Sequence, residues 1–417
     1  MNPVLKLILV LICFYNAPAE TPEKIIQQLN ETILEVPAST KMAIMVYDPL
    51  TQDTLININH TTSMIPASNT KLFTTATALE LMGGDYLIST KIFADDEDFF
   101  DGTLNGNIYI KGFGNPTFTT ENLEELVNKL YQSGLRKITG NIYGDDTYFD
   151  NIYSRDDWIS EEKANVKLPP ISALVIDRNR TVVTKKRRGR YRNYFVNVQD
   201  PPSFAAKKLK EKLDAYGIEA EGNALSGQTP DNSKLLLESS IELRELIREI
   251  NKSSDNFYAE CLFKTLGSFY SGRQGNSFFS TQAILNFIED NSIYSTGTKI
   301  VDGSGISRFD QVTAGAIVGL LEKVYFSIDQ FEDFYNSLSI AGVNGTLHRR
   351  MVGTRAENNF RGKTGTLNGV SSLAGYVTTA DDDDLIVCIM FEFTSGGASK
   401  HKKIQDKIIQ ALAEWKQ

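Results

Sequence analysis

The chain has 417 residues, more than the roughly 100 to 200 residues of an ordinary domain, which predicts several domains or one domain with a large insertion. Hydrophobic residues make up 41% and charged residues 23%, which excludes collagen-like, coiled-coil and wholly disordered chains. The net charge of -9 has the wrong sign for a chain that wraps nucleic acid, so we expect no such partner. Three Cys and three His, without Cys-x-x-Cys or His-Glu-x-x-His, predict neither a metal site nor a cofactor.

The N-terminus predicts an export signal. Lys6 precedes an apolar run at residues 7–14, and a small-x-small sequence ends at Ala19, so we expect residues 1–19 to be removed there. The alternative is a membrane anchor, but a span needs about 20 apolar residues and this run is much shorter. We therefore expect an exported, soluble protein of the periplasm or cell envelope, without an integral membrane span.

Export gives the two remaining cysteines a possible second role. Cys261 and Cys388 would lie in an oxidising compartment, where thiols can form a disulfide. Both stand in apolar surroundings, which is typical of small buried core residues. The sequence does not place their Cα atoms within bridging distance, and we expect two buried thiols.

Hydrophobic periodicity predicts helices and strands at both ends of the chain and a β-rich middle. Apolar residues at helical spacing predict helices at 21–34, 68–82, 241–250 and 256–266 and a last helix at the C-terminus. Apolar runs predict strands at 42–47, 54–58, 371–377 and 385–393. Between 86 and 235 short alternating runs and Gly and Asp turns predominate, with helical patterns at 123–135 and 204–216. The middle therefore reads as a separate, mostly β module.

A Ser-x-x-Lys spacing occurs at Ser68, Ser160 and Ser399. Only Ser68 opens a predicted helix, on which Lys71 shares its face three residues later. The helix N-terminus favours negative charge developing on Ser68 Oγ. A lysine whose pKa is lowered by burial can accept the serine proton without any histidine. The alternative is that Ser68 is only a helix N-cap.

Two further motifs follow in the chain. Ser254 and Asn256 belong to the one Ser-x-Asn motif, and Lys363 begins the one Lys-Thr-Gly motif. Ser-x-x-Lys, Ser-Asp-Asn and Lys-Thr-Gly occur together in β-lactamases and penicillin-binding proteins. Three motifs in this order predict one acylating site.

The chemistry of each side chain indicates a role. Ser68 attacks a carbonyl, and Lys71 removes its proton. The Ser254 hydroxyl relays a proton toward the leaving amine. Asn256 holds the acyl side chain of the substrate through its amide.

The third motif predicts recognition of the substrate. Lys363 supplies positive potential for a terminal carboxylate, with the hydroxyls of Thr364 and Thr366 as donors. Gly365 permits close approach of backbone to ligand. The backbone N–H groups of Ser68 and Thr366 are expected to form the oxyanion hole.

Two competing motifs fail on single positions. A phosphate-binding loop ending in Lys363 would need glycine where Glu357 stands, and a nucleophile elbow around Ser304 would need glycine where Asp302 stands. We interpret residues 302–305 as a structural turn near the site, with the alternative that they line the substrate groove.

A basic run stands out in this acidic chain. It occupies residues 185–192, from Lys185 to Arg192. The simpler interpretation is a solvated hairpin tip, and the alternative is a contact with an anionic partner such as a cell-envelope polymer.

With these motifs, the chain resembles the D-alanyl-D-alanine carboxypeptidase/endopeptidase branch of the penicillin-binding proteins, the penicillin-binding protein 4 type. The resemblance extends to residues 144–146, 170–174, 302–308, 345–347 and 373–376. In one departure, Asn115 stands where the family usually has Asp. In another, the insertion is shorter than in the longest members.

The resemblance implies an α+β fold, in which a β-lactamase/transpeptidase-like domain with an antiparallel sheet and a helical subdomain is split by a mostly β insertion. We expect the catalytic domain at 20–85 and 236–417 and the insertion at 86–235. The resemblance also implies hydrolysis of the terminal D-Ala of peptidoglycan stem peptides and cross-links through an acyl-enzyme, and covalent inhibition by β-lactam antibiotics.

Two other functions remain open. A serine β-lactamase shares the acylation residues but needs a further Glu or Tyr to activate a deacylating water, which we do not identify. A non-catalytic cell-wall-binding scaffold would not need the complete set of acylation residues that this chain has.

Overall fold

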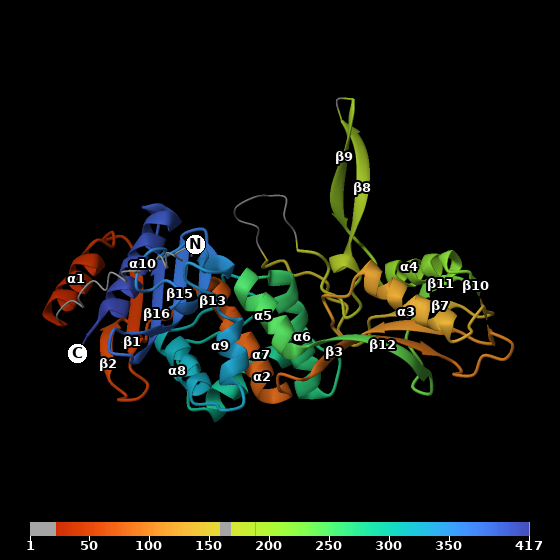
Figure 1. Ribbon diagram of the computed structural model, residues 1–417, viewed down its shortest axis with the longest axis horizontal. Coiled ribbons are helices and arrows are strands. Elements are labelled where there is room, and N and C mark those ends of the chain that lie inside the picture. The colour runs from red at the N-terminus through yellow and green to blue at the C-terminus, as the bar shows by residue number, and fades with distance from the viewer. Residues whose placement is uncertain (1–21, 159–167, 188, 417) are drawn as a thin grey trace, which may run out of the picture.

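The structure is a computed structural model that describes residues 22–158, 168–187 and 189–416. A large sheet lies at one end of an elongated molecule, helices lie in the middle, and smaller sheets lie at the other end (Figure 1). The predicted export signal at 1–19 and Ser160 lie outside the described residues. Within these residues, no helix combines the length and the apolar character needed to cross a membrane.

The large sheet has six strands in the order β13-β14-β15-β16-β1-β2, and all its neighbours are antiparallel. Its strands are β1 (Lys41–Tyr47), β2 (Thr54–Ile58), β13 (Ser339–Ile340), β14 (Arg361–Leu367), β15 (Val370–Thr378) and β16 (Asp384–Glu392). β1 pairs with β16 along its whole length, from Lys41 opposite Glu392 to Tyr47 opposite Ile386. The two ends of the chain therefore build one sheet.

Helices cover both faces of this sheet, which explains why β16 is a continuous apolar run. Its side chains alternate: Val387 and Ile389 join the core under one pair of helices, and Ile386 and Cys388 join the core on the other face. The first face is covered by α1 (Pro22–Leu34) and α10 (Gly397–Glu414). The core on the other face also contains six helices: α2 (Thr70–Met82), α5 (Leu243–Ser253), α6 (Asn256–Ser271), α7 (Ser277–Asp290), α8 (Ala314–Tyr325) and α9 (Phe331–Ser337).

Both described cysteines are buried free thiols. Cys388 belongs to the core of the large sheet, whereas Cys261 lies in a small separate cluster with Ile171, Val175 and Phe257. The expectation of two buried thiols is therefore confirmed.

A second core lies in the middle of the sequence. Its five-stranded sheet has the order β11-β7-β5-β3-β12, and a three-stranded sheet with the order β10-β6-β4 lies in the same region. The strands are β3 (Leu87–Ala94), β4 (Thr103–Leu104), β5 (Ile108–Gly112), β6 (Lys137–Ile138), β7 (Ile142–Asp145), β10 (Glu219–Ala220), β11 (Ala224–Ser226) and β12 (Lys234–Glu242), with helices α3 (Thr120–Gln132) and α4 (Pro201–Ala215). These elements share one apolar cluster of their own.

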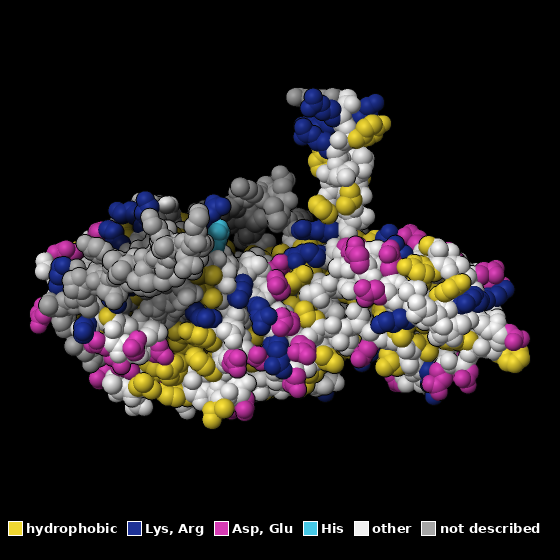
Figure 2. All heavy atoms as spheres, in the orientation of Figure 1, with side chains coloured by type: hydrophobic (Ala, Val, Ile, Leu, Met, Phe, Trp, Pro, Cys, Tyr) yellow, Lys and Arg dark blue, Asp and Glu magenta, His cyan; other side chains and the backbone are white. Residues whose placement is uncertain are grey.

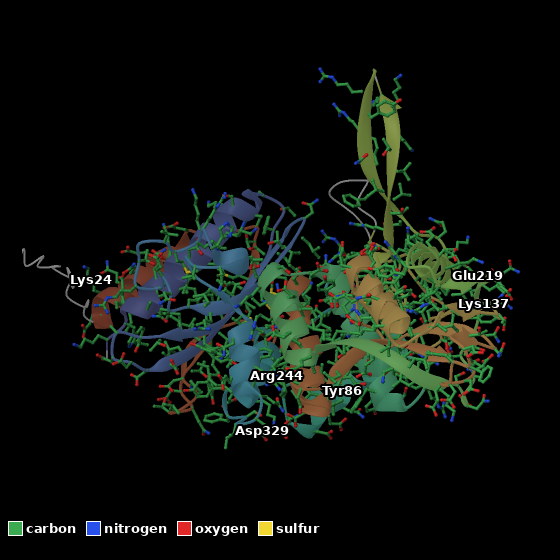
Figure 3. All side chains as sticks on the ribbon, turned by 45° about the vertical axis from the view of Figure 1, so that its right-hand side comes forward. Lys24, Tyr86, Lys137, Glu219, Arg244 and Asp329 are labelled. Carbon is green, nitrogen blue, oxygen red and sulfur yellow. The ribbon has the colours of Figure 1, made fainter. Side chains whose placement is uncertain are left out.

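The chain enters and leaves this second core at neighbouring points. Tyr86 and Arg244 lie near each other in Figure 3, whereas Lys137 and Glu219 mark the far end of the molecule. The Leu243 N–H donates to the Tyr86 carbonyl and the Arg244 N–H to the Gly84 carbonyl, both at 2.9 Å. The three-part division of the chain stays a prediction, and β12, which continues to Glu242, would move its second boundary from 235 to 242.

A two-stranded hairpin of β8 (Arg180–Arg187) and β9 (Arg190–Asn197) projects away from the body of the molecule (Figure 1). The basic run lies at its free end, so the predicted hairpin tip is confirmed.

Buried Asn115 accepts the backbone and side-chain hydrogen bonds of Thr117 through Oδ1. An aspartate could accept the same two bonds.

Candidate active site

Ser68 lies in η1 (Ala67–Asn69), a short 3-10 turn that continues into α2. Ala67 has a φ of 49°, a left-handed conformation that is strained for a residue other than glycine and is concentrated at functional sites. Ser68 does not occupy the cap position of either helix, and neither cap position carries a side-chain cap hydrogen bond. The alternative that Ser68 is only an N-cap is therefore wrong.

Lys71 is held by three acceptors. Its Nζ donates to Ser68 Oγ at 3.1 Å, to Asn256 Oδ1 at 2.6 Å and to the Ser304 carbonyl at 2.6 Å. These partners match the three donors of an ammonium group. Burial lowers the pKa of Lys71 to about 8, although the nearby carboxylate of Asp302 opposes this shift. A substantial neutral fraction near physiological pH is what a lysine base requires.

Three buried carboxyl groups lie close to Lys71. Burial, with the charge of Asp302, raises the pKa of Glu260 to about 8 and raises the pKa of Asp310 well above its usual value. Glu260 accepts the Gly303 N–H at 3.1 Å. The raised pKa values of Glu260 and Asp310 reduce the negative charge that these two carboxyl groups place beside Lys71.

Asp302 organises the turn that touches Lys71. Its carboxylate accepts the backbone N–H groups of Ser304, Gly305 and Ser307 at 3.1, 2.6 and 2.8 Å. The turn carries the Ser304 carbonyl that binds Lys71, so the interpretation of residues 302–305 as a structural turn near the site agrees with this geometry. Gly305 is required here: it has a φ of +77°, and a Cβ would lie 1.9 Å from the Ala67 carbonyl oxygen.

The second motif lies at the junction of two helices. Ser254 ends α5 in a left-handed conformation with a φ of 57°, and Asn256 is the first residue of α6. Lys363 Nζ, from β14, donates to Ser254 Oγ at 2.8 Å and to the Thr364 carbonyl at 2.9 Å. Burial and the positive charge of Lys71 lower the pKa of Lys363 well below its usual value. The second and third motifs therefore meet directly.

The strand that carries Lys363 packs against the turn of Ser68. A Cβ at Gly365 would lie 2.6 Å from the Pro66 carbonyl oxygen, so glycine permits this close approach. The Thr364 hydroxyl donates to Thr346 at 2.8 Å, in η3 (Gly345–Leu347). Thr366 is exposed on the same strand. Its role and that of the Ser68 N–H in an oxyanion hole stay predictions.

The outer edge of β14 is open next to these groups. Within the described residues, β13 pairs only with Arg361 and Gly362, so no strand covers positions 363–367 on that side. Ser68, Ser254 and Asn256 are half-buried, whereas both lysine side chains are buried. The arrangement exposes the hydroxyl groups to a ligand and keeps the amines away from bulk water.

The middle segment of the chain contacts this site, which the sequence did not predict. Arg178 binds Asp255 through both guanidinium nitrogens, at 2.8 and 3.0 Å. Asp255 in turn caps α6 by accepting the Tyr258 N–H at 3.0 Å. Trp158 Nε1 donates to Asp302 at 3.1 Å. The second motif and the turn at 302–305 are thus each held by a side chain of the middle segment.

The remaining Ser-x-x-Lys spacings do not contribute to this arrangement. Ser399 lies exposed in the first turn of α10, and Ser160 lies outside the described residues. Sequence reasoning missed Glu260 and Asp310. The available signal was a lone acid within an otherwise apolar helix for Glu260, whereas Asp310 stands in a loop without any motif.

An antiparallel sheet packed on helices, with a serine–lysine pair at their junction, defines an α+β transpeptidase-like fold. The family model of the "D-Ala-D-Ala carboxypeptidase 3 (S13) family" matches residues 25–193 and 187–415. The chain belongs to this family. It is therefore a hydrolase, a serine-type D-Ala-D-Ala carboxypeptidase.

Individual relatives agree with this assignment. The chain is 29% identical to the D-alanyl-D-alanine carboxypeptidase of Actinomadura sp. (strain R39), over 92% of this chain and 84% of that protein. It is 24% identical to the D-alanyl-D-alanine carboxypeptidase DacB of Haemophilus influenzae, over 85% and 86% of the two chains.

A crystal structure of penicillin binding protein 4 (dacB) from Haemophilus influenzae superimposes with a TM-score of 0.82 at 22% identity, over 93% of this chain and 99% of that chain. The complex of that protein with a novel β-lactam gives a TM-score of 0.76 at 21% identity, over 91% and 98% of the chains. The expected α+β fold is confirmed.

Proposed function

We propose that this carboxypeptidase acts on peptidoglycan stem peptides through an acyl-enzyme on Ser68. One observation carries the proposal: buried Lys71, with its pKa lowered to about 8, lies 3.1 Å from Ser68 Oγ and is fixed by Asn256 and the Ser304 carbonyl. A neutral Lys71 accepts the Ser68 proton while Oγ forms a bond to the carbonyl carbon of the penultimate D-Ala.

The leaving group then needs a proton. The Ser254 hydroxyl, 2.8 Å from Lys363 Nζ, relays the proton that Lys71 has taken up to the amine of the terminal D-Ala as the peptide bond breaks. Water subsequently hydrolyses the ester to Ser68 and releases the shortened peptide. The backbone N–H groups of Ser68 and Thr366 stabilise the oxyanion in both steps.

Substrate recognition rests on the third motif. Lys363 attracts the terminal carboxylate, and the hydroxyls of Thr364 and Thr366 donate to it. The Asn256 amide, at the edge of the same site, holds the acyl side of the peptide. A β-lactam presents a carboxylate and a strained amide in a similar arrangement, so we propose that β-lactams acylate Ser68 and inhibit the enzyme.

We also propose that the enzyme cleaves peptide cross-links as an endopeptidase, and that it acts in the periplasm or cell envelope after removal of residues 1–19. The open edge of β14 supports the first proposal, because an extended peptide can lie along an unpaired strand edge. The N-terminal sequence pattern supports the second.

Fluorescent penicillin labelling tests the nucleophile. We expect the protein to be labelled and Ser68→Ala to abolish labelling while it still folds. Ser399→Ala is the matched control, because it removes the serine of an exposed Ser-x-x-Lys spacing. Labelling of Ser68→Ala at the native level would show that another residue is the nucleophile.

Substrate assays separate the alternatives. We expect D-Ala release from a pentapeptide, cleavage of a cross-linked muropeptide dimer, and slow penicillin turnover. Fast penicillin turnover without D-Ala release would support a serine β-lactamase. Absence of both labelling and D-Ala release would support a cell-wall-binding scaffold.

A further inference from the structure

The hairpin of β8 and β9 exposes most of its side chains to solvent. Its strands pair from Arg180 opposite Asn197 to Arg187 opposite Arg190, and it projects from the body as a narrow ribbon (Figure 1). In an antiparallel pair, directly opposed residues lie on the same face, and faces alternate along each strand. The register therefore assigns every side chain of the ribbon to one of two faces.

One face concentrates positive charge at the free end. Lys185 stands opposite Arg192, and Arg187 stands opposite Arg190. Like charges directly opposite each other destabilise a strand pair, and all four side chains are exposed. Among the described residues, no ion pair joins any of the four to a carboxylate, and the sequence of the hairpin contains no acid. The arrangement weakens the isolated hairpin and suits an anionic surface.

The other face exposes apolar side chains. Val182 stands opposite Phe195, and Lys186 stands opposite Tyr191 with its Nζ 5.6 Å from the ring centroid. Phe195 and Tyr191 are 77% and 72% exposed, and Val182 is 50% exposed. In Figure 2 the free end shows Lys and Arg side chains with hydrophobic side chains next to them and along the ribbon. Transfer of such aromatic rings from water to an apolar environment is favourable.

We propose that this hairpin docks the protein onto an anionic lipid surface. The hairpin enters the surface with its free end, so both of its faces are in contact with lipid. The cations of one face bind acidic headgroups, while Tyr191 and Phe195 on the other face enter the interface between headgroups and acyl chains. Polybasic segments bind anionic bilayers, and aromatic residues are enriched at the membrane–water interface. A soluble polyanion would match the four cations, but it would leave the exposed aromatic and aliphatic side chains without a partner. The two chemistries together favour the lipid surface.

The binding is reversible and peripheral in this proposal. The hairpin carries no catalytic group and lies outside the described contacts of Ser68 and Lys71. Attachment therefore leaves the hydrolytic site free and restricts the enzyme to the vicinity of a membrane. This inference is independent of the proposed catalytic roles.

Vesicle co-sedimentation of the full chain tests the proposal. The probes are vesicles of phosphatidylcholine alone, vesicles of phosphatidylcholine mixed with anionic phosphatidylglycerol, and soluble polyphosphate as a competitor. The charge variant is K185Q/R187Q/R190Q/R192Q, and the apolar variant is V182T/Y191S/F195S. The matched control, K207Q/K234Q/K400Q/K403Q, removes four exposed lysines elsewhere on the molecule.

We expect binding to anionic vesicles only, with loss of affinity as salt rises. Each basic residue near an anionic bilayer contributes about fivefold to the partition coefficient, so the charge variant should lose several hundred-fold and the control much less. The apolar variant should also bind at least tenfold more weakly. In Y191W, brominated acyl chains should quench tryptophan fluorescence beyond the quenching seen in the native protein.

Three results would overturn the proposal. They are equal binding of the charge variant and the control, unchanged binding of the apolar variant without quenching in Y191W, and binding to polyphosphate but not to anionic vesicles. D-Ala release from a soluble peptide should be unchanged in all three multiple variants, which shows that the body of each variant has folded.

Discussion

The lowered pKa of Lys71 predicts how acylation depends on pH. Only the neutral amine can accept the Ser68 proton, and a pKa of about 8 leaves about a tenth of Lys71 neutral at pH 7, half at pH 8 and nine-tenths at pH 9. The rate of penicillin acylation at low penicillin concentration should therefore rise about tenfold from pH 6 to 7 and level off above pH 9. Stopped-flow labelling with fluorescent penicillin measures this profile.

Two variants connect the profile to the structure. Lys71→Arg keeps a positive charge but is never neutral in this range, so acylation should fall by about 100-fold to 10,000-fold, the usual contribution of a general base. Asp302→Asn removes a negative charge that raises the pKa of Lys71, so the rising part of the profile should move to lower pH.

A flat profile between pH 6 and 9 in the native enzyme would refute the assignment of Lys71 as the base. So would a Lys71→Arg variant that acylates at the native rate. Circular dichroism and urea unfolding of both variants serve as folding controls, because a misfolded protein loses labelling at every pH rather than shifting its profile.

Three further variants test the supporting contacts. Gly305→Ala should lower the free energy of unfolding in urea by more than about 2 kcal/mol. Gly353→Ala, with a similar φ but nothing within 4 Å of the new Cβ, should lower it by less. Equal losses of unfolding free energy would exclude the steric clash. Arg178→Ala should slow acylation by about 10-fold to 100-fold because the second motif moves, while Arg248→Ala, which breaks a surface pair, should leave the rate within about twofold. Lys363→Met should raise KM for a peptide with a free terminal carboxylate by about 10-fold to 100-fold, and a smaller effect on the matching peptide amide is the outcome that supports charge recognition.

Motif spacing and periodicity predicted the parts of this protein that are local in sequence. The helix after Ser68 and the strands at both ends of the chain follow from runs of apolar residues, and the three motifs predicted the residues that meet at the site. Helix α8 was missed, because it is buried on nearly every side and lacks a polar face to reveal its period.

The contacts between distant segments were beyond the sequence. Nothing in the residues around Arg178 indicates that its partner is Asp255, 77 positions later. Burial was equally hidden: the lowered pKa of Lys71 results from packing by segments that no local pattern brings together. A single sequence shows which side chains could react, and tertiary packing decides their protonation.

The pairing of β1 with β16 determines when the enzyme can become active. Lys41 lies opposite Glu392, so the large sheet cannot close until the chain has been made as far as residue 392. Contacts so distant in sequence form slowly, because a long loop must first be closed. The segment that builds the second core has its own apolar cluster and can fold earlier. Ser68 and Lys71 can therefore meet Lys363 only after the chain has been made as far as β14, and a shorter nascent chain carries no assembled hydrolytic site.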